Sequence, residues 1–244
     1  MEKKEYDWFM KKAGHFSASK AKDLLSKSGS WTKGNISYIM EIAYQRKTGR
    51  PMPSVSSRTL KMGIENEPMA VDWLRENTDW IILHCDTDFD EKIFDVPFDD
   101  VMFGVSPDAF KMSMPVMAQY NKAFKSYIEA LIEIKCVVGR ERELFYFSDE
   151  YMFEEKRKEA FIEHGEQLAA QMLAYPTVQK AILLKYLPQS DFDEFDMDSP
   201  LDPSRGLVFE YTRDELSELM SVSEKRVRYA DAWIKSGKTI RDIH

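Results

Sequence analysis

Glu133 and Lys135 stand two residues apart in an apolar stretch of the sequence, residues 131–137. Side chains alternate along a strand, so Ile132 and Ile134 are expected on one face and Glu133 and Lys135 on the other. One strand can then present a metal-binding carboxylate beside a basic side chain. These residue types suit metal-dependent hydrolysis of a phosphodiester, in which carboxylates hold Mg²⁺ next to a basic group at the attacking water.

Asp108 is a candidate for the second carboxylate of such a site. It follows Pro107 in the segment Gly-Val-Ser-Pro-Asp, residues 104–108. A Ser-Pro-Asp turn is common by itself, and so is Glu-x-Lys in an alternating strand. Their order is more informative than either motif, because a strand that ends in Pro-Asp precedes a strand that carries Glu-x-Lys.

Glu67 is a third candidate, on a helix predicted over residues 57–76. Its spacing places it on the same stripe of that helix as four apolar residues, Leu60, Ile64, Val71 and Leu74. A carboxylate that faces the core is costly unless it is paired or holds a metal. A Glu at the edge of the stripe that reaches solvent is the alternative. Beside Asp108 and Glu133, a third metal carboxylate is the better interpretation.

The elements that must position these residues alternate between helical and strand patterns. Helices are predicted over residues 36–48 (ended by Gly49), 57–76, 150–174 and 213–235, with a short helical stretch to about residue 26 that Ser17-Ala18-Ser19 precedes. Strands are predicted over residues 80–85, 101–106, 131–137, 181–187 and 206–211. This order predicts an α/β fold, a central mixed sheet flanked by helices.

Length and composition are those of an ordinary globular protein. The chain has 244 residues, of which 43% are hydrophobic and 31% charged. We expect one domain over residues 1–244, with a helical part at 1–50, a catalytic core at 57–187 and a C-terminal strand and helix at 206–244. No apolar run approaches the ~20 residues of a membrane span, and no signal-peptide pattern follows the first residues, so a cytoplasmic location is expected.

The residue counts exclude several other classes of site. Only two cysteines are present, Cys85 and Cys136, so neither a disulfide framework nor a four-cysteine metal site can form within one chain. The four histidines lack the spacing of a zinc hydrolase. No Gly-x4-Gly-Lys-(Ser/Thr) segment is present, which argues against an ATP-driven step.

The net charge of −8 argues mildly against a nucleic-acid partner, but the charge is unevenly distributed. Residues 1–50 hold eleven Lys and Arg against five Asp and Glu. Acidic residues gather at 86–100 and 191–202, which are expected to be solvated surface. DNA is therefore expected to approach from the basic N-terminal side.

Motifs along most of the chain resemble the PD-(D/E)xK nuclease superfamily, and within it the λ-exonuclease/YqaJ branch of viral alkaline exonucleases. An N-terminal segment of that branch, Trp-x3-Arg-x-Gly-x2-(Thr/Ser)-Ala-Ser, is similar to the segment that here runs from Trp8 through Lys12 and Gly14 to Ser19. Its Gly-x3-Glu helix resembles residues 63–70. The remaining matches are Ser106-Pro107-Asp108, Glu133-Ile134-Lys135-Cys136, Gln167 and the strand-to-helix passage 206–214.

The resemblance implies a role for each matched residue. Asp108 and Glu133 would bind Mg²⁺, with Mn²⁺ as a substitute, together with the backbone carbonyl of Ile134 and with Glu67. Lys135 would position or deprotonate the attacking water, and Gln167 would orient that water or the phosphate. Three further positions match those that hold the 5′-terminal phosphate in the family, namely Lys12, Ser19 and Ser106.

The chain departs from the family pattern at several positions. Lys12 replaces the usual Arg, which keeps the charge but loses the bidentate fork. The gap between Asp108 and Glu133 is longer than usual, so residues 111–130 resemble an insertion that would form a DNA-facing or subunit-facing flap or an extended hairpin. Three more positions differ, at Ala109 for Gly and at His164 and Ala169 for the Tyr and second Gln around Gln167.

The resemblance implies a PD-(D/E)xK restriction-endonuclease-like core and a Mg²⁺-dependent exonuclease that digests one strand of duplex DNA from its 5′ end. It also implies a phage or prophage origin, service in recombination with a single-strand annealing protein, and a homotrimeric ring. Two alternatives stay open. One is a PD-(D/E)xK endonuclease of restriction or repair type. The other is a catalytically silent DNA-end-binding scaffold.

Overall fold

A five-stranded mixed sheet forms the centre of this computed structural model, which describes residues 3–25, 31–52, 58–89, 92–115, 124–137, 150–188 and 199–237. The strand order is β2-β4-β5-β6-β7. Only the β5–β6 pair is parallel, and the other neighbours in this sheet are antiparallel. The strands are β2 (Ile81–His84), β4 (Ala109–Met112), β5 (Ile128–Cys136), β6 (Lys180–Tyr186) and β7 (Gly206–Thr212).

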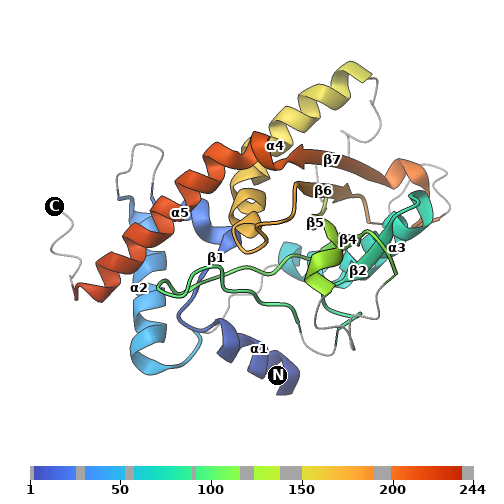
Figure 1. The fold of residues 1–244 in the computed structure, drawn as a ribbon. Coiled ribbons are helices and arrows are strands. Elements are labelled where there is room, and N and C mark those ends of the chain that lie inside the picture. Colours follow the sequence, from blue (N-terminus) through green and yellow to red (C-terminus); the bar gives the residue numbers. More distant parts are fainter. Residues whose placement is uncertain are drawn as a thin grey trace.

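Helices cover both faces of this sheet, so the predicted α/β class with a central mixed sheet is confirmed (Figure 1). The α-helices are α1 (Lys3–Lys12), α2 (Lys33–Thr48), α3 (Arg58–Asn77), α4 (Glu150–Met172) and α5 (Arg213–Lys235). Within the described residues, short 3-10 helices accompany them at η1 (Ala18–Asp23), η2 (Phe124–Tyr127) and η4 (Pro203–Arg205). The four predicted long helices are confirmed with small changes in their ends.

Local chemistry explains where the helices begin and end. Thr32 and Thr212 each form a capping box at the start of α2 and α5. Gly49 ends α2 in the left-handed conformation, as predicted. Ser17 stands at the N-cap of η1, but its side chain makes no capping hydrogen bond there.

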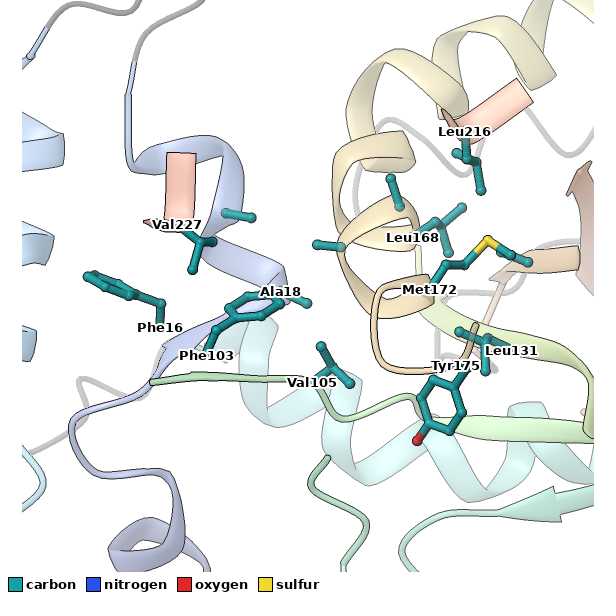
Figure 2. Close-up of a cluster of buried hydrophobic side chains, with 14 of the residues drawn as sticks. Phe16, Ala18, Phe103, Val105, Leu131, Leu168, Met172, Tyr175, Leu216 and Val227 are labelled. Carbon is teal, nitrogen blue, oxygen red and sulfur yellow. The ribbon is translucent and has the colours of Figure 1, made fainter. Parts of the chain in front are cut away.

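Each face of the sheet has its own apolar cluster. On one face, Ile132 and Ile134 pack with Val71 and Leu74 of α3. On the other face, alternate residues such as Leu131 pack under α4 and α5 with Leu168 and Leu216 among others (Figure 2). Because the middle of β5 is covered on both faces, the polar residue Glu133 there is only 3% exposed.

A second, two-stranded sheet connects the N-terminal part to the central sheet. Strand β1 (Phe16–Ser17) pairs in parallel with β3 (Phe103–Gly104). Phe16 and Phe103 belong to the same apolar cluster as Leu131, and they lie near Val227 of α5 (Figure 2). A Cβ atom on Gly104 would lie 1.9 Å from Phe94 Cζ, so this strand needs glycine there.

Two strand predictions differ from the structure. The strand predicted over residues 101–106 is only two residues long and lies outside the central sheet. Strand β4 (Ala109–Met112) was missed, and its second half, Lys111 and Met112, was assigned to the start of an insertion. The first residues of the stretch 111–130 belong to β4 and its last residues to β5, which pair in antiparallel fashion, and residues 116–123 lie outside the described part.

The apolar stripe predicted for α3 is wrong in its first half. Val71 and Leu74 are buried, but Leu60 is 51% and Ile64 is 60% exposed. The second half of the helix packs on the sheet, whereas these two residues do not belong to either core cluster. None of the described helices is long and apolar enough to cross a membrane.

The expected solvated acidic surface at residues 86–100 is in part a set of ion pairs. Asp88 pairs with Arg75 at 2.6 Å, Asp95 with Lys125 at 2.5 Å and Asp100 with Arg228 at 2.8 Å. These pairs fasten the segment to α3, η2 and α5. The acidic run at 191–202 lies outside the described residues except for its last four positions.

Candidate active site

The carboxylate of Glu133 is almost completely buried between β5 and α4, and three donors of the chain hold it. Gln167 Nε2 lies 2.5 Å and Lys135 Nζ 2.6 Å from its Oε1, and Gln171 Nε2 lies 2.6 Å from its Oε2. A buried charge needs such donors, since an unpaired carboxylate would cost several kcal/mol or more. The strand alternation predicted for Glu133 and Lys135 thus places both side chains toward α4.

Gln171 was missed in the sequence, although a signal was present. Gln167 and Gln171 are one helical turn apart, so both amides lie on the face of α4 that meets β5. The Gln171 side chain is 1% exposed, and its Oε1 has no hydrogen-bond partner among the described residues. Its amide is therefore held through the donation to Glu133.

Asp108 lies beside Glu133 because of strand pairing. Ala109 of β4 pairs with Ile132 of β5, so the residue before β4 lies next to the middle of β5. The Ile134 N–H donates to Asp108 Oδ2 at 2.7 Å, and the Asp108 N–H donates to the Ile132 carbonyl at 3.1 Å. The structure thus connects Asp108 to the Ile134 N–H, whereas the carbonyl of Ile134 was the predicted metal ligand.

Glu67 faces the same region from α3 and is held by a histidine that sequence reasoning did not assign. His84 of β2 is buried, and its Nε2–H donates to Glu67 Oε1 at 2.9 Å. The other ring nitrogen, Nδ1, lies 2.8 Å from Thr87 Oγ1 and accepts from that hydroxyl when the ring is neutral. Seventeen residues separate Glu67 from His84, so no local spacing points to this pair.

The three carboxylates affect one another electrostatically. Desolvation, and then the negative charges of Glu133 and Glu67, raise the pKa of Asp108 well above its usual range. Burial lowers the pKa of Lys135, but Glu133 and Asp108 outweigh burial and leave this pKa above its ordinary value. Lys135 is thus an ammonium group at neutral pH, placed to offset negative charge.

Cys136 is also set by this electrostatic environment. Its thiol donates to the Gly63 carbonyl at 3.7 Å, between β5 and α3. Burial, with the charges of Glu67 and Asp108, raises the pKa of Cys136 to about 12. The thiol is therefore protonated and unreactive at neutral pH.

The donor chemistry at this position fits a hard divalent cation, although the predicted ligand set is not assembled as one group. Among the described residues, no three Asp, Glu, His or Cys side chains come together in a way that could hold a metal ion. Each carboxylate is instead bonded to a donor of the chain, as for Glu67 with His84. The fit rests on the oxygen donors and on the raised pKa of Asp108, which desolvation and then the negative charges of Glu133 and Glu67 cause and which a cation would offset. The metal set of Glu67, Asp108, Glu133 and Ile134 stays a prediction.

The three residues predicted to bind a 5′-phosphate lie on α1, on η1 and after β3. Pairing of Ser17 with Gly104 places Ser19 and Ser106 two residues beyond matched positions of two parallel strands. Lys12 Nζ lies 5.1 Å from the centre of the Trp8 ring. Burial, and then the charge of Lys92, lower the pKa of Lys12. The described contacts do not join Lys12 to either serine, so the pocket stays a prediction.

Arg46 is one of the eleven Lys and Arg residues of the segment 1–50, and it has a structural role. It pairs with the buried Asp231 of α5 at 2.8 Å, and its Nε donates to the carbonyl of Gly14 at 2.8 Å. Gly14 has a φ of 79°, which favours glycine at the turn between α1 and β1. Arg46 therefore fastens α2 to α5 and to the N-terminal segment.

Comparison with solved structures shows which proteins have a similar fold. The chain is similar to an alkaline exonuclease, LHK-Exo, from Laribacter hongkongensis, with a TM-score of 0.59, 20% identity and 94% of each chain covered. LHK-Exo in complex with dAMP matches with a TM-score of 0.59 and 22% identity over 94% of each chain. A phage-related exonuclease from Haemophilus somnus 129PT matches with a TM-score of 0.58 and 16% identity, over 91% of this chain and 94% of that one. No family model and no curated protein sequence matches.

The chain therefore has the fold of the alkaline and phage-related exonucleases, with a central mixed sheet flanked by helices. The predicted resemblance to the λ-exonuclease branch of the PD-(D/E)xK nucleases is confirmed as a likeness of fold over more than nine-tenths of the chain.

Proposed function

We propose that this protein is a Mg²⁺-dependent exonuclease that degrades one strand of double-stranded DNA from its 5′ end. One observation carries the proposal. In a chain with an exonuclease fold, Asp108, Glu133 and Lys135 lie together at neighbouring strands, and their charges act on one another. An acidic pair beside a fixed ammonium group is the chemistry that phosphodiester hydrolysis needs.

The chain's own residues would hold the reactants in the following way. Asp108 and Glu133 would bind Mg²⁺, supported by Glu67 and the Ile134 carbonyl, and Lewis-acid activation of the phosphate and of a water would come from that cation. Lys135 would place its ammonium group against the negative charge that develops on the phosphate. Gln167 and Gln171 would keep the Glu133 carboxylate in one orientation, as they do in this structure.

The deciding experiment compares linear and closed-circular duplex DNA. End-labelled linear duplex should be shortened in Mg²⁺ and left intact in EDTA, while the closed circle should persist in both. Labels at the 5′ and 3′ ends of the same strand give the direction of digestion. Cleavage of the closed circle would instead favour the endonuclease alternative, and binding of DNA ends without any hydrolysis would favour the silent scaffold.

Two further expectations belong to the same proposal. A monomer with an acidic net charge has a weak electrostatic hold on a duplex, and a ring of three subunits would retain DNA by enclosure. Light scattering at micromolar concentration should then give about three times the 28.5 kDa of one chain. Digestion from the 5′ end leaves the complementary strand as a 3′-ended single strand, which would be passed to a single-strand annealing protein. A monomer that releases DNA after each cut would contradict the ring.

A further inference from the structure

Two lysines and a histidine lie next to the candidate active site, around Glu163 of α4. Lys185 Nζ and His164 Nε2 lie 3.4 Å and 3.3 Å from Glu163 Oε2. Lys22 Nζ donates to the Glu163 carbonyl at 3.2 Å. The group thus joins η1 to α4 and β6, which lie more than a hundred residues later in the sequence.

Strand register makes this group continuous with the active site. Lys135 and Lys185 are paired residues of the parallel strands β5 and β6, so their side chains leave the same face of the sheet. Across from them, α4 presents Gln171 and Gln167 to Glu133, and one further turn toward its start it presents His164 and Glu163. The polar side chains of the sheet that face α4 are therefore contiguous: Glu133 is followed by Lys135 on β5, and Lys185 lies next to Lys135 on β6.

The contact between Lys185 and Glu163 is looser than a close structural ion pair. The Lys185–Glu163 distance of 3.4 Å exceeds the ~2.7–2.9 Å of a close charge-assisted hydrogen bond. The Lys185 side chain is only 12% exposed, whereas that of Glu163 is 49% exposed. Lys185 approaches the Glu163 carboxylate, and Lys22 binds the backbone carbonyl of the same residue. Burial raises the pKa of Glu163, but His164, Lys185 and Lys22 outweigh burial and lower it. The exposed Glu163 carboxylate thus contacts Lys185 at a long distance and feels the charge of Lys22, and a phosphate could take its place.

We propose that Lys185 and Lys22 bind the backbone phosphate adjacent to the one at Glu133 and Lys135, with Glu163 as the counter-ion that this phosphate displaces. The ligand class is a nucleic-acid phosphodiester, and the inference rests on the proposed nuclease function. The site differs from the predicted 5′-phosphate residues, because it uses η1, α4 and β6 and involves neither Lys12 nor Ser106. Its role is to align the strand, and the reacting phosphate stays at Lys135.

The test is the salt dependence of DNA binding in EDTA, where no strand is cut. Anisotropy of a fluorescein-labelled duplex gives the slope of log K against log salt, whose magnitude decreases by about 0.7 to 0.9 for each phosphate that the protein no longer neutralises. Lys185→Gln and Lys22→Gln should each reduce the slope by about this amount. Glu163→Gln should tighten binding, since it removes the competing charge. Lys180→Gln is the matched control, because Lys180 lies at the other end of β6 and pairs with the exposed Glu210.

Hydrolysis of the same duplex in Mg²⁺ separates this inference from the proposed function. If the wild type cuts the duplex but both lysine variants keep the wild-type slope, the second phosphate site is wrong and the nuclease stands. If the slopes change as expected and nothing is cut, the phosphate site stands and the nuclease is wrong. Thermal melting shows whether Lys185→Gln is folded, and Lys22 is exposed enough that its variant should fold in any case.

Discussion

Gln171 of α4 donates a 2.6 Å hydrogen bond to the buried Glu133 of β5, across a sequence separation of 38 residues. With Gln167 on the other carboxylate oxygen, the two amides fix the plane of the carboxyl group. The helix and the sheet are therefore joined through the charged group that the proposed chemistry uses. The stability of this interface and the orientation of Glu133 should then change together.

Gln171→Leu should lower both stability and activity. The substitution nearly keeps the volume but removes a donor from a buried carboxylate, which costs about 1–3 kcal/mol of unfolding free energy. Urea unfolding measures the loss, and turnover of end-labelled duplex measures the effect on Glu133. Gln179→Leu is the control, since Gln179 is exposed and its side chain donates to the nearby Thr177 carbonyl. Unchanged turnover in folded Gln171→Leu would show that Glu133 does not need this donor.

Lys135→Ala should reduce hydrolysis by about 100-fold or more, since it removes a fixed positive charge at the proposed reaction centre. The fold and Mn²⁺ binding should stay nearly intact, whereas Asp108→Ala and Glu133→Ala should also lose the metal. Isothermal titration with Mn²⁺ separates the two classes of variant. The control is Lys180→Ala, at an exposed site on β6. Wild-type turnover in Lys135→Ala would mean that the site is misassigned.

Duplexes with a 5′-phosphate should be digested faster than duplexes with a 5′-hydroxyl. A terminal phosphate would gain charge-assisted bonds from Lys12, with Ser19 and Ser106 as further donors. Lys12→Ala should remove most of the preference, and Lys11→Ala, at the exposed neighbouring position, should keep it. The measurement is the initial rate on both substrates. Equal rates with the wild type would remove the 5′-phosphate pocket from the mechanism.

Glu215→Gln should make the protein less sensitive to acid. The Thr212 N–H and the Arg157 guanidinium lower the pKa of Glu215 from 4.5 to about 2 in the folded chain. Because this pKa is depressed on folding, its stabilisation is full above pH 4.5 and is lost as the pH falls toward 2. The melting temperature of the wild type should therefore fall more steeply across this interval than that of the variant. Glu218→Gln, on the same helix and exposed, should follow the wild type.

Much of the fold and part of the site could be predicted from local patterns. Alternation in residues 131–137 placed Glu133 and Lys135 on one face of a strand, and helix spacing and capping signals gave α2, α3, α4 and α5 nearly to their ends. These predictions succeed because side-chain direction and helix ends depend on neighbours within a few residues. The motif order alone also indicated the fold that the solved structures share.

Tertiary structure decided which side chains hold the carboxylates. His84 meets Glu67 because β2 lies next to α3, and Gln171 meets Glu133 because α4 packs on β5. Lys185 lies beside Lys135 because of the register between β5 and β6, and the sequence of one strand does not determine that register. Exposure of Leu60 and Ile64 likewise depends on which part of α3 packs against the sheet. Sequence spacing determines the face of an element, but the partner on the other side depends on contacts between distant segments, which only the folded chain brings together.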